Sequence, residues 1–313
     1  MNDYGLFGGV LRSDVELPEL APVPQGPLRW HLTTVSALEG QADGVLLGRE
    51  PVEAGVTVGL YRNASGYRLA FDDTGTFGIT PDGSRIAWLP PPSPNLSAVR
   101  KDILGRVMAV CLQLQGVVAL HGSAVDLEGT GLCFLAPKFH GKSTTAAALV
   151  DAGARLLADD LVAVACGATP MILPSVPWLQ LWRDSAERVA VSSESIPGTE
   201  SEAKVQRRWA ERRGDEASRV PFTAAYLLAP VADNASASVQ RVKLGGVAGS
   251  LALLSQAKIV NLLGAEGRAA LLGSLSDLTA RVPVYRLLVP RNFERLPELV
   301  QALREWHRHP AAG

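Results

Sequence analysis

Short runs of alternating apolar and polar residues dominate the first 90 positions, a pattern typical of β-strands with one buried face. Residues 56–62 and 67–71 are two such runs, and they flank the tetrapeptide Asn-Ala-Ser-Gly at 63–66, which is a hairpin signal. The alternation continues to about residue 89. We therefore expect residues 1–94 to form a mainly antiparallel β-domain.

A proline cluster at residues 90–94 marks a change of pattern and reads as a linker. Beyond it, apolar residues recur three or four positions apart, which predicts a helix that Asn95 or Ser97 could cap. These apolar residues are Ile103, Val107, Val110 and Leu114. We expect residues 95–115 to form a helix that bridges two domains.

From residue 116 onward, strand-like and helix-like patterns alternate. Apolar runs at 117–125 and 131–135 predict a β-hairpin, and an alanine-rich helix is expected over 144–150. The later expected elements are a strand at 222–228, helices near 246–256 and 265–280, a strand at 282–289 and a last helix at about 294–306. This alternation predicts a second domain of the α/β class over residues 116–313.

The amino-acid composition indicates a globular protein but does not indicate which reaction or ligand it serves. The 313 residues are 47% apolar, enough for about two domains with packed cores. The net charge of −1 gives no sign of a nucleic-acid or anionic-membrane partner. The three cysteines lie in apolar surroundings without a metal-binding spacing, which is typical of buried thiols in a reducing compartment.

Two further observations bear on location. The N-terminal residues lack the basic and apolar regions of a signal peptide. The uncharged tract 161–182 is long enough to cross a membrane, but prolines at 170, 174 and 177 divide it. We therefore expect a cytoplasmic protein that binds neither nucleic acid nor a membrane.

The segment after the predicted strand 131–135 carries the most specific chemical signal. It reads Ala136-Pro137-Lys138-Phe139-His140-Gly141-Lys142-Ser143-Thr144. This is close to the phosphate-binding pattern G-x-x-x-x-G-K-[ST], with Ala136 in place of the first glycine. The backbone N–H groups of such loops and the following helix N-terminus bind nucleotide phosphates. Lys142 is expected to reach the terminal phosphates and Ser143 to hold Mg²⁺.

Two carboxylates follow the next predicted strand. Asp159 and Asp160 end the run 154–160, with Asp159 sixteen positions after Ser143. Ligands gather at the carboxyl ends of strands in open α/β sheets, and phosphoryl transfer needs a carboxylate for the metal ion and a base for the acceptor hydroxyl. An Asp-Asp pair alone is more often a solvated turn, but the phosphate-loop motif at this spacing favours the functional interpretation.

The polar, highly charged stretch 192–219 has two open interpretations. It is either a solvated loop or helix, or a mobile lid that brings a cation to the transferred phosphoryl group. The candidate lid cations are Lys204, Arg207 and Arg208, followed by Arg212 and Arg213.

Taken together, these motifs resemble a known family. The residues that carry the resemblance are His121-Gly122, Val125-Asp126, Gly131, the phosphate loop and Leu157-Ala158-Asp159-Asp160. They are similar to the catalytic core of HPr kinase/phosphorylase, whose fold is related to that of phosphoenolpyruvate carboxykinase. The resemblance is tight over about residues 120–165. The whole chain, with the segment 11–20 before a β-rich domain, is more similar to HPr-kinase-related proteins such as the lasso peptide kinases.

The resemblance implies roles for individual residues, with ATP and Mg²⁺ as cofactors. Asp159 would be the base for the acceptor hydroxyl, Asp160 the metal-side carboxylate, and His121 a neighbour that orients the base. Without the resemblance, His121 is more simply a hydrogen-bonded histidine at a strand end.

The sequence departs from the family pattern G-x-S-G-x-G-K-S at two glycines, which are replaced by Ala136 and Phe139. Glycine adopts backbone angles that phenylalanine tolerates badly, and it lets phosphate approach the chain closely. Lys138 and His140 add donors that could compensate. The glycine-rich segment that follows the acidic pair in HPr kinases is also replaced, by residues 172–178, so HPr is not the expected substrate.

The leading hypothesis is an ATP- and Mg²⁺-dependent kinase that phosphorylates a hydroxyl, with a serine of a ribosomal (lasso-type) precursor peptide or of a protein as the first choice of acceptor. The alternatives are a non-catalytic nucleotide-binding regulatory or scaffold protein, and a kinase for a sugar or another small molecule. The N-terminal domain either binds a peptide along a sheet edge or caps the kinase core. The resemblance leaves homo-oligomeric assembly open.

Overall fold

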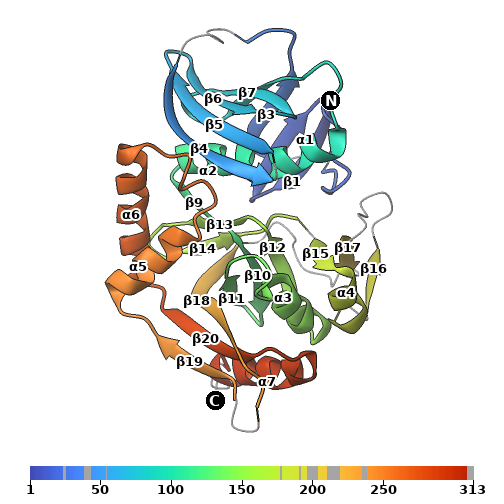
Figure 1. The fold of residues 1–313 in the computed structure, drawn as a ribbon, viewed down its shortest axis with the longest axis vertical. Coiled ribbons are helices and arrows are strands. Elements are labelled where there is room, and N and C mark those ends of the chain that lie inside the picture. The colour runs from blue at the N-terminus through green and yellow to red at the C-terminus, as the bar shows by residue number, and fades with distance from the viewer. Residues whose placement is uncertain are drawn as a thin grey trace. The chain divides into compact units, whose positions relative to one another are not determined.

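The computed structural model describes residues 1–23, 26–38, 44–53, 55–176, 178–189, 192–195, 204–209, 219–234 and 238–308. The described chain is mixed α/β with several sheets (Figure 1). It separates into two compact units, residues 1–119 with 257–275, and residues 120–256 with 276–313.

The first unit contains a mixed sheet in the order β1-β2-β3-β8-β7-β6-β5-β4. Its strands are β1 (Asn2–Leu6), β2 (Gly9–Ser13), β3 (Leu28–Thr34), β4 (Val45–Glu53), β5 (Val56–Asn63), β6 (Gly66–Phe71), β7 (Gly75–Ile79) and β8 (Arg85–Leu89). β3 runs parallel to both of its neighbours, and the other neighbouring pairs are antiparallel. The predicted hairpin is present as β5 and β6, with Asn63 Oδ1 accepting from Ser65 N in the turn.

A helical segment follows the proline cluster and packs within this same unit. It consists of α1 (Leu96–Asp102), a π-helical turn (Ile103–Val107) and α2 (Met108–Leu114). Asn95 caps it as predicted, because its side chain accepts from the backbone of Ser97 and Ala98. Two ion pairs join it to other parts of the unit, Arg100 to Glu19 in the turn after β2 and Arg106 to Glu50 on β4. Residues 95–115 therefore group with the first unit.

Residues 257–275 also belong to the first unit, which differs from the predicted continuous domain of residues 116–313. One contact of this segment with the β-sheet is a close backbone approach at Gly48 on β4. A Cβ added to Gly48 would lie 2.2 Å from the carbonyl oxygen of Asn261, so only glycine lets the two segments meet. The buried side chains of Ile259 and Leu262 lie in the same segment.

The second unit contains a mixed sheet whose path runs β12-β10-β11-β18-β14-β13, with β20 and β19 joined beside β18. Its strands are β10 (Gly122–Leu127), β11 (Thr130–Leu135), β12 (Arg155–Asp159), β13 (Val162–Ala165), β14 (Met171–Leu173), β18 (Val220–Val231), β19 (Gln240–Lys243) and β20 (Val284–Pro290). β11, β18 and β20 are parallel neighbours. The strand expected over 117–125 is divided into β9 (Val117–Leu120) and β10, and His121 lies at the break.

Helices of the second unit supply much of the core around this sheet. They are α3 (Lys142–Asp151), α4 (Arg183–Val189), α5 (Gly246–Ser255) and α7 (Leu296–Trp306) after a short 3₁₀ turn (Phe293–Arg295). A further helix, α6 (Ala265–Thr279), belongs to the first unit up to Leu275. Apolar residues of α3 and α7 pack in one core with the stacked rings of Phe134 and Tyr226 from β11 and β18. This packing fixes the N-terminal end of α3 beside the ends of the central strands (Figure 1).

The described parts of the charged stretch 192–219 are mainly strands, and not a loop or helix. β16 (Ser193–Ser195) and β17 (Lys204–Trp209) form a small antiparallel sheet with β15 (Trp178–Trp182) in the order β15-β17-β16. Arg212 and Arg213 lie outside the described residues. Among the helices that the structure describes, none is long and apolar enough to cross a membrane.

Candidate functional site

The site is built where three elements of the second unit end or begin. β11 leads into residues 136–143, which we call the phosphate loop, and α3 begins at Lys142. β10 pairs antiparallel with β12, and this register sets Ser123 opposite Asp159. The apolar residues of β11 and β12 bury these strands, so the polar groups that follow them are held at a fixed edge of the sheet.

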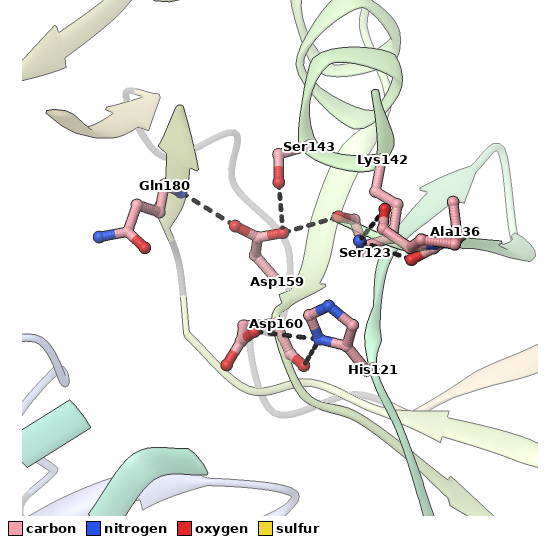
Figure 2. A network of polar contacts seen from close by, with 9 residues as sticks. His121, Ser123, Ala136, Lys142, Ser143, Asp159, Asp160 and Gln180 are labelled. Atoms are coloured by element: carbon pink, nitrogen blue, oxygen red, sulfur yellow. Dashed lines mark hydrogen bonds and ion pairs between the residues drawn. The ribbon is translucent and has the colours of Figure 1, made fainter. Parts of the chain in front are cut away.

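The phosphate loop is closed by hydrogen bonds of its own residues. Lys142 Nζ donates to the carbonyl oxygens of Ala136 (2.8 Å) and Pro137 (3.2 Å), which bends its side chain back over the loop (Figure 2). Gly141 has a φ of 87° and lies immediately before the helix, where glycine adopts the left-handed conformation without steric cost. His140 Nδ1 lies 2.9 Å from the carbonyl oxygen of Lys138.

Phe139 also adopts a left-handed conformation, with a φ of 69°. A bulky residue rarely does so, and this is one of the two positions where the family pattern has glycine and this chain does not. Its side chain is 67% exposed, and its ring stacks on the ring of Trp182, with centroids 5.3 Å apart and planes 23° apart. The loop thus keeps a glycine-like backbone at Phe139 with an aromatic neighbour beside it.

Asp159 lies at the centre of the site and is only 6% exposed. Ser123 Oγ and Ser143 Oγ both donate to its Oδ1, at 2.6 and 3.0 Å, and Gln180 N donates to its Oδ2 at 2.9 Å (Figure 2). Burial raises the pKa of the Asp159 carboxyl, and the hydrogen bonds from Ser123 and Gln180 oppose that rise. Donors on both oxygens fix the orientation of this carboxylate.

Asp160 has a different environment although it is the next residue. Its side chain is 50% exposed, and its Oδ1 lies 3.1 Å from Nδ1 of His121. The same ring nitrogen lies 3.2 Å from the carbonyl oxygen of Asp160. Asp160 has a φ of 64° in a tight turn closed by Leu161 N and the carbonyl oxygen of Asp159. This turn directs the two carboxylates to different neighbours (Figure 2).

The phosphate loop, His121, Asp159 and Asp160 thus lie together as the sequence predicted, with one difference in pairing. The sequence paired Ser143 with Asp160 as metal ligands, whereas the hydroxyl of Ser143 donates to Asp159. Among the described residues, no group of three or more His, Cys, Asp or Glu side chains could hold a metal ion. A carboxylate and a hydroxyl still suit Mg²⁺, which takes one or two protein oxygens and completes its shell with phosphate oxygens and water.

The candidate lid cations lie on β17. Lys204 Nζ lies 4.9 Å from the centroid of the Trp182 ring, which connects it to the phosphate loop through the stack with Phe139. Arg207 donates to Ser195 Oγ on β16, and Arg208 is the register partner of Trp178 and Glu194. Lys204 is therefore the member of the three that packs with a neighbour of the loop.

Three contributors were not found from the sequence. Ser123 is a polar residue within an apolar run, two positions after His121, and that position is a usable signal. Gln180 acts through its backbone N–H, which carries no sequence signal. Trp182 reaches the loop only because β15 folds beside α3.

No protein-family model matches the sequence. Over 93 residues the chain is 34% identical to the HPr kinase/phosphorylases of two strains of Treponema pallidum. The aligned stretch covers 28% of this chain and 29% of each relative, so the chain spans less than a third of the curated relatives it matches. The HPr(Ser) kinase/phosphatase of Coxiella burnetii aligns in structure at 12% identity with a TM-score of 0.33, over 61% of this chain and 95% of that one.

Proposed function

We propose that this protein is an HPr-kinase-like phosphotransferase that uses ATP and Mg²⁺ to phosphorylate a hydroxyl group. One observation carries the proposal. The hydroxyl of Ser143, in the first turn of α3, donates to the buried carboxylate of Asp159 at the end of β12, and the next residue, Asp160, pairs with His121. The site therefore has two adjoining halves, a nucleotide-binding half with Ser143 and an acceptor-facing half with Asp160.

The nucleotide half consists of the loop and the start of α3. Backbone N–H groups at a helix N-terminus attract phosphate, and Lys142 already lies over the loop, where it can exchange its two carbonyl partners for phosphate oxygens. Mg²⁺, when bound, would neutralise charge on the transferred group. Ser143 and Asp159 are the oxygen ligands that this chain offers for it.

The contacts favour an exchange of the two carboxylate roles expected from the family resemblance. Asp159 is buried and bonded to Ser143, which suits the metal side. Asp160 is half exposed and bonded to His121, which suits a base that receives the proton of an acceptor hydroxyl arriving from solvent. In this assignment His121 orients Asp160 and stabilises its charge.

The proposed acceptor is a serine hydroxyl of a peptide or protein. The support is the likeness to HPr kinase/phosphorylases over 93 residues together with the exposure of Asp160, which leaves room for a chain-like substrate. A sugar or another small metabolite is the competing acceptor. A cytoplasmic location and a homo-oligomeric state belong to the same proposal.

A second candidate function is favoured by the loop itself. Phe139 and Ala136 replace glycines, and a bulky ring stands at a position where phosphate ordinarily approaches bare backbone. A protein that binds nucleotide, or a partner, without transferring phosphate fits that observation. Its signature is ligand binding with no phosphorylated product when the acceptor is supplied.

Thermal unfolding with and without Mg²⁺–ATP tests the nucleotide site. Ligand at about 100 times its Kd adds about 2.7 kcal/mol to the free energy of unfolding, which raises the melting temperature by several degrees. We expect this rise in the wild type and its loss in Lys142→Ala. Lys243→Ala, which removes an exposed lysine from β19, is the matched control and should keep the rise.

Product detection separates the candidate functions. Incubation with Mg²⁺–ATP and a library of serine-containing peptides, read by mass spectrometry, should give a mass increase of one phosphoryl group on a peptide. A shift in melting temperature without any phosphorylated peptide or metabolite would favour the non-catalytic candidate. No shift at millimolar nucleotide would contradict the kinase and every nucleotide-binding role, and would leave only the partner-binding form of the non-catalytic candidate.

A further inference from the structure

The stacked rings of Phe139 and Trp182 form a contact between two separate parts of the second unit. Phe139 belongs to the phosphate loop, whereas Trp182 is the last residue of β15 in the small sheet. Both rings are more than one-third exposed, at 67% and 39%, so hydrophobic burial explains little of their pairing. Their near-parallel geometry is one that aromatic pairs prefer.

The backbone at Phe139 needs a stabilising neighbour. A phenylalanine held at a φ of 69° is strained, and strained residues persist only where surrounding contacts hold them. Trp182 supplies a ring for that purpose. Lys204 fixes the ring in turn, because it is the β-register partner of Trp182 and its Nζ lies 4.9 Å from the ring centroid.

β15 also holds the other half of the site. Gln180, two residues before Trp182, donates its backbone N–H to Asp159 Oδ2 at 2.9 Å. One short strand therefore contacts the buried carboxylate through Gln180 and the loop through Trp182. Its position sets the loop and the carboxylate relative to each other.

We propose that Trp182 is a positioning residue that holds the phosphate loop in its nucleotide-binding conformation through Phe139. In the common pattern a glycine adopts the left-handed backbone conformation at this position without steric cost. Here the aromatic pair stabilises that conformation, which phenylalanine without a stacked neighbour would not keep. The inference rests on the proposed function for its effect on nucleotide affinity. It does not rest on that function for its effect on the loop.

A four-protein cycle in the full-length chain tests the coupling. The proteins are the wild type, Trp182→Ala, Phe139→Gly and the double variant, and the measurement is the Kd for Mg²⁺–ADP. Trp182→Ala should raise the Kd about tenfold, which corresponds to about 1.4 kcal/mol. In the Phe139→Gly background the same change should raise it less than twofold, because glycine adopts the left-handed angle without support.

Two controls separate this effect from general damage to the strand. Trp182→Phe keeps a ring for stacking and should restore affinity to within about threefold of the wild type. Trp178→Ala removes a tryptophan from the same strand, four residues away, and should lack the dependence on residue 139. An equal loss for Trp182→Ala in both backgrounds, or no loss in either, would overturn the proposal.

Hydrogen exchange of the nucleotide-free protein gives a readout that does not need binding. The amides of residues 138–142 should exchange faster in Trp182→Ala than in the wild type, and this difference should vanish in the Phe139→Gly background. If the wild type binds no nucleotide, the proposed function fails while the exchange data still decide the role of Trp182. Unchanged exchange in Trp182→Ala would refute that role even where nucleotide binds.

Discussion

The two halves of the candidate site are held in different ways. Asp159 is buried at the end of a paired strand, and three donors, from Ser123, Ser143 and Gln180, fix both of its oxygens. The phosphate loop is exposed at Phe139, which has a left-handed backbone and one stacked aromatic ring beside it. The carboxylate half is thus held by three hydrogen bonds at the end of a strand, while under the proposed role of Trp182 the loop half needs a side-chain contact that a single substitution removes.

The same contrast recurs between the two adjacent carboxylates. Asp159 loses solvent on folding and so has a raised pKa, whereas Asp160 keeps solvent and gains a histidine neighbour. Adjacent groups with such different surroundings are suited to different tasks. Substituting each carboxylate in turn is the most direct test of whether the two have different roles.

The largest effect is expected for Asp159→Asn. If Asp159 is the metal-side carboxylate, its loss should reduce phosphoryl transfer by about 10³-fold or more, since a metal ion contributes several kcal/mol of charge stabilisation. The Mg²⁺-dependent part of nucleotide binding should fall with it. Isothermal titration with ATP in the presence of Mg²⁺ or EDTA measures that part. A variant that keeps full Mg²⁺-dependent binding would return the metal role to Asp160.

A smaller and more selective effect is expected for Asp160→Asn. General-base catalysis contributes about 10²- to 10⁴-fold, so transfer should fall at least about 100-fold while Mg²⁺-dependent nucleotide binding stays within about twofold of the wild type. His121→Gln is the companion variant. It should also lower the rate constant of phosphoryl transfer, but by a smaller factor than Asp160→Asn, because it removes only the neighbour of the base. Equal losses of binding and transfer in Asp160→Asn would contradict the division of roles.

The sequence predicted those parts of the site that lie close together along the chain. The loop and the helix after it follow from local spacing, and the strand before Asp159 follows from its apolar run. What it missed depends on tertiary register, such as Ser123 opposite Asp159 and the backbone N–H of Gln180. The roles of the two carboxylates could not be separated by sequence, because only the turn at Asp160 directs them to different neighbours.

The same limit applies to the fold. Elements with a strong period, such as the helix within 95–115 and the hairpin of β5 and β6, lie where the pattern predicted them. The charged segment has no such period, and the described part of it forms strands because β15 offers an edge on which β17 can pair. Residues 257–275 group with the first unit and approach Gly48 where that residue has no side chain. The sequence does not reveal this close approach, because it does not show which segment lies beside Gly48.

The smallest expected effect concerns Asp102, a buried carboxylate of the first unit. It serves as a reference for how burial changes the pKa of a carboxyl outside the site. Burial raises its pKa to about 6, and the hydrogen bond from Thr74 only partly opposes this. Because the folded pKa lies above the unfolded value, its stabilising contribution is fully present below about pH 4 and is lost as the pH rises through about 6. Relative to Asp102→Asn, the wild type should lose about 2 kcal/mol between pH 4 and pH 7.

Thermal unfolding of both proteins across that pH range measures the difference, and Asp82→Asn is the control of opposite sign. Hydrogen bonds from Thr80 and Ser84 lower the pKa of Asp82 to about 2, so its contribution is lost only as the pH falls below about 4. The stability difference between the wild type and Asp82→Asn should therefore be nearly constant between pH 4 and pH 7. A constant difference for Asp102→Asn as well would mean that burial does not penalise this carboxylate, and the same inference for Asp159 would then lose its support.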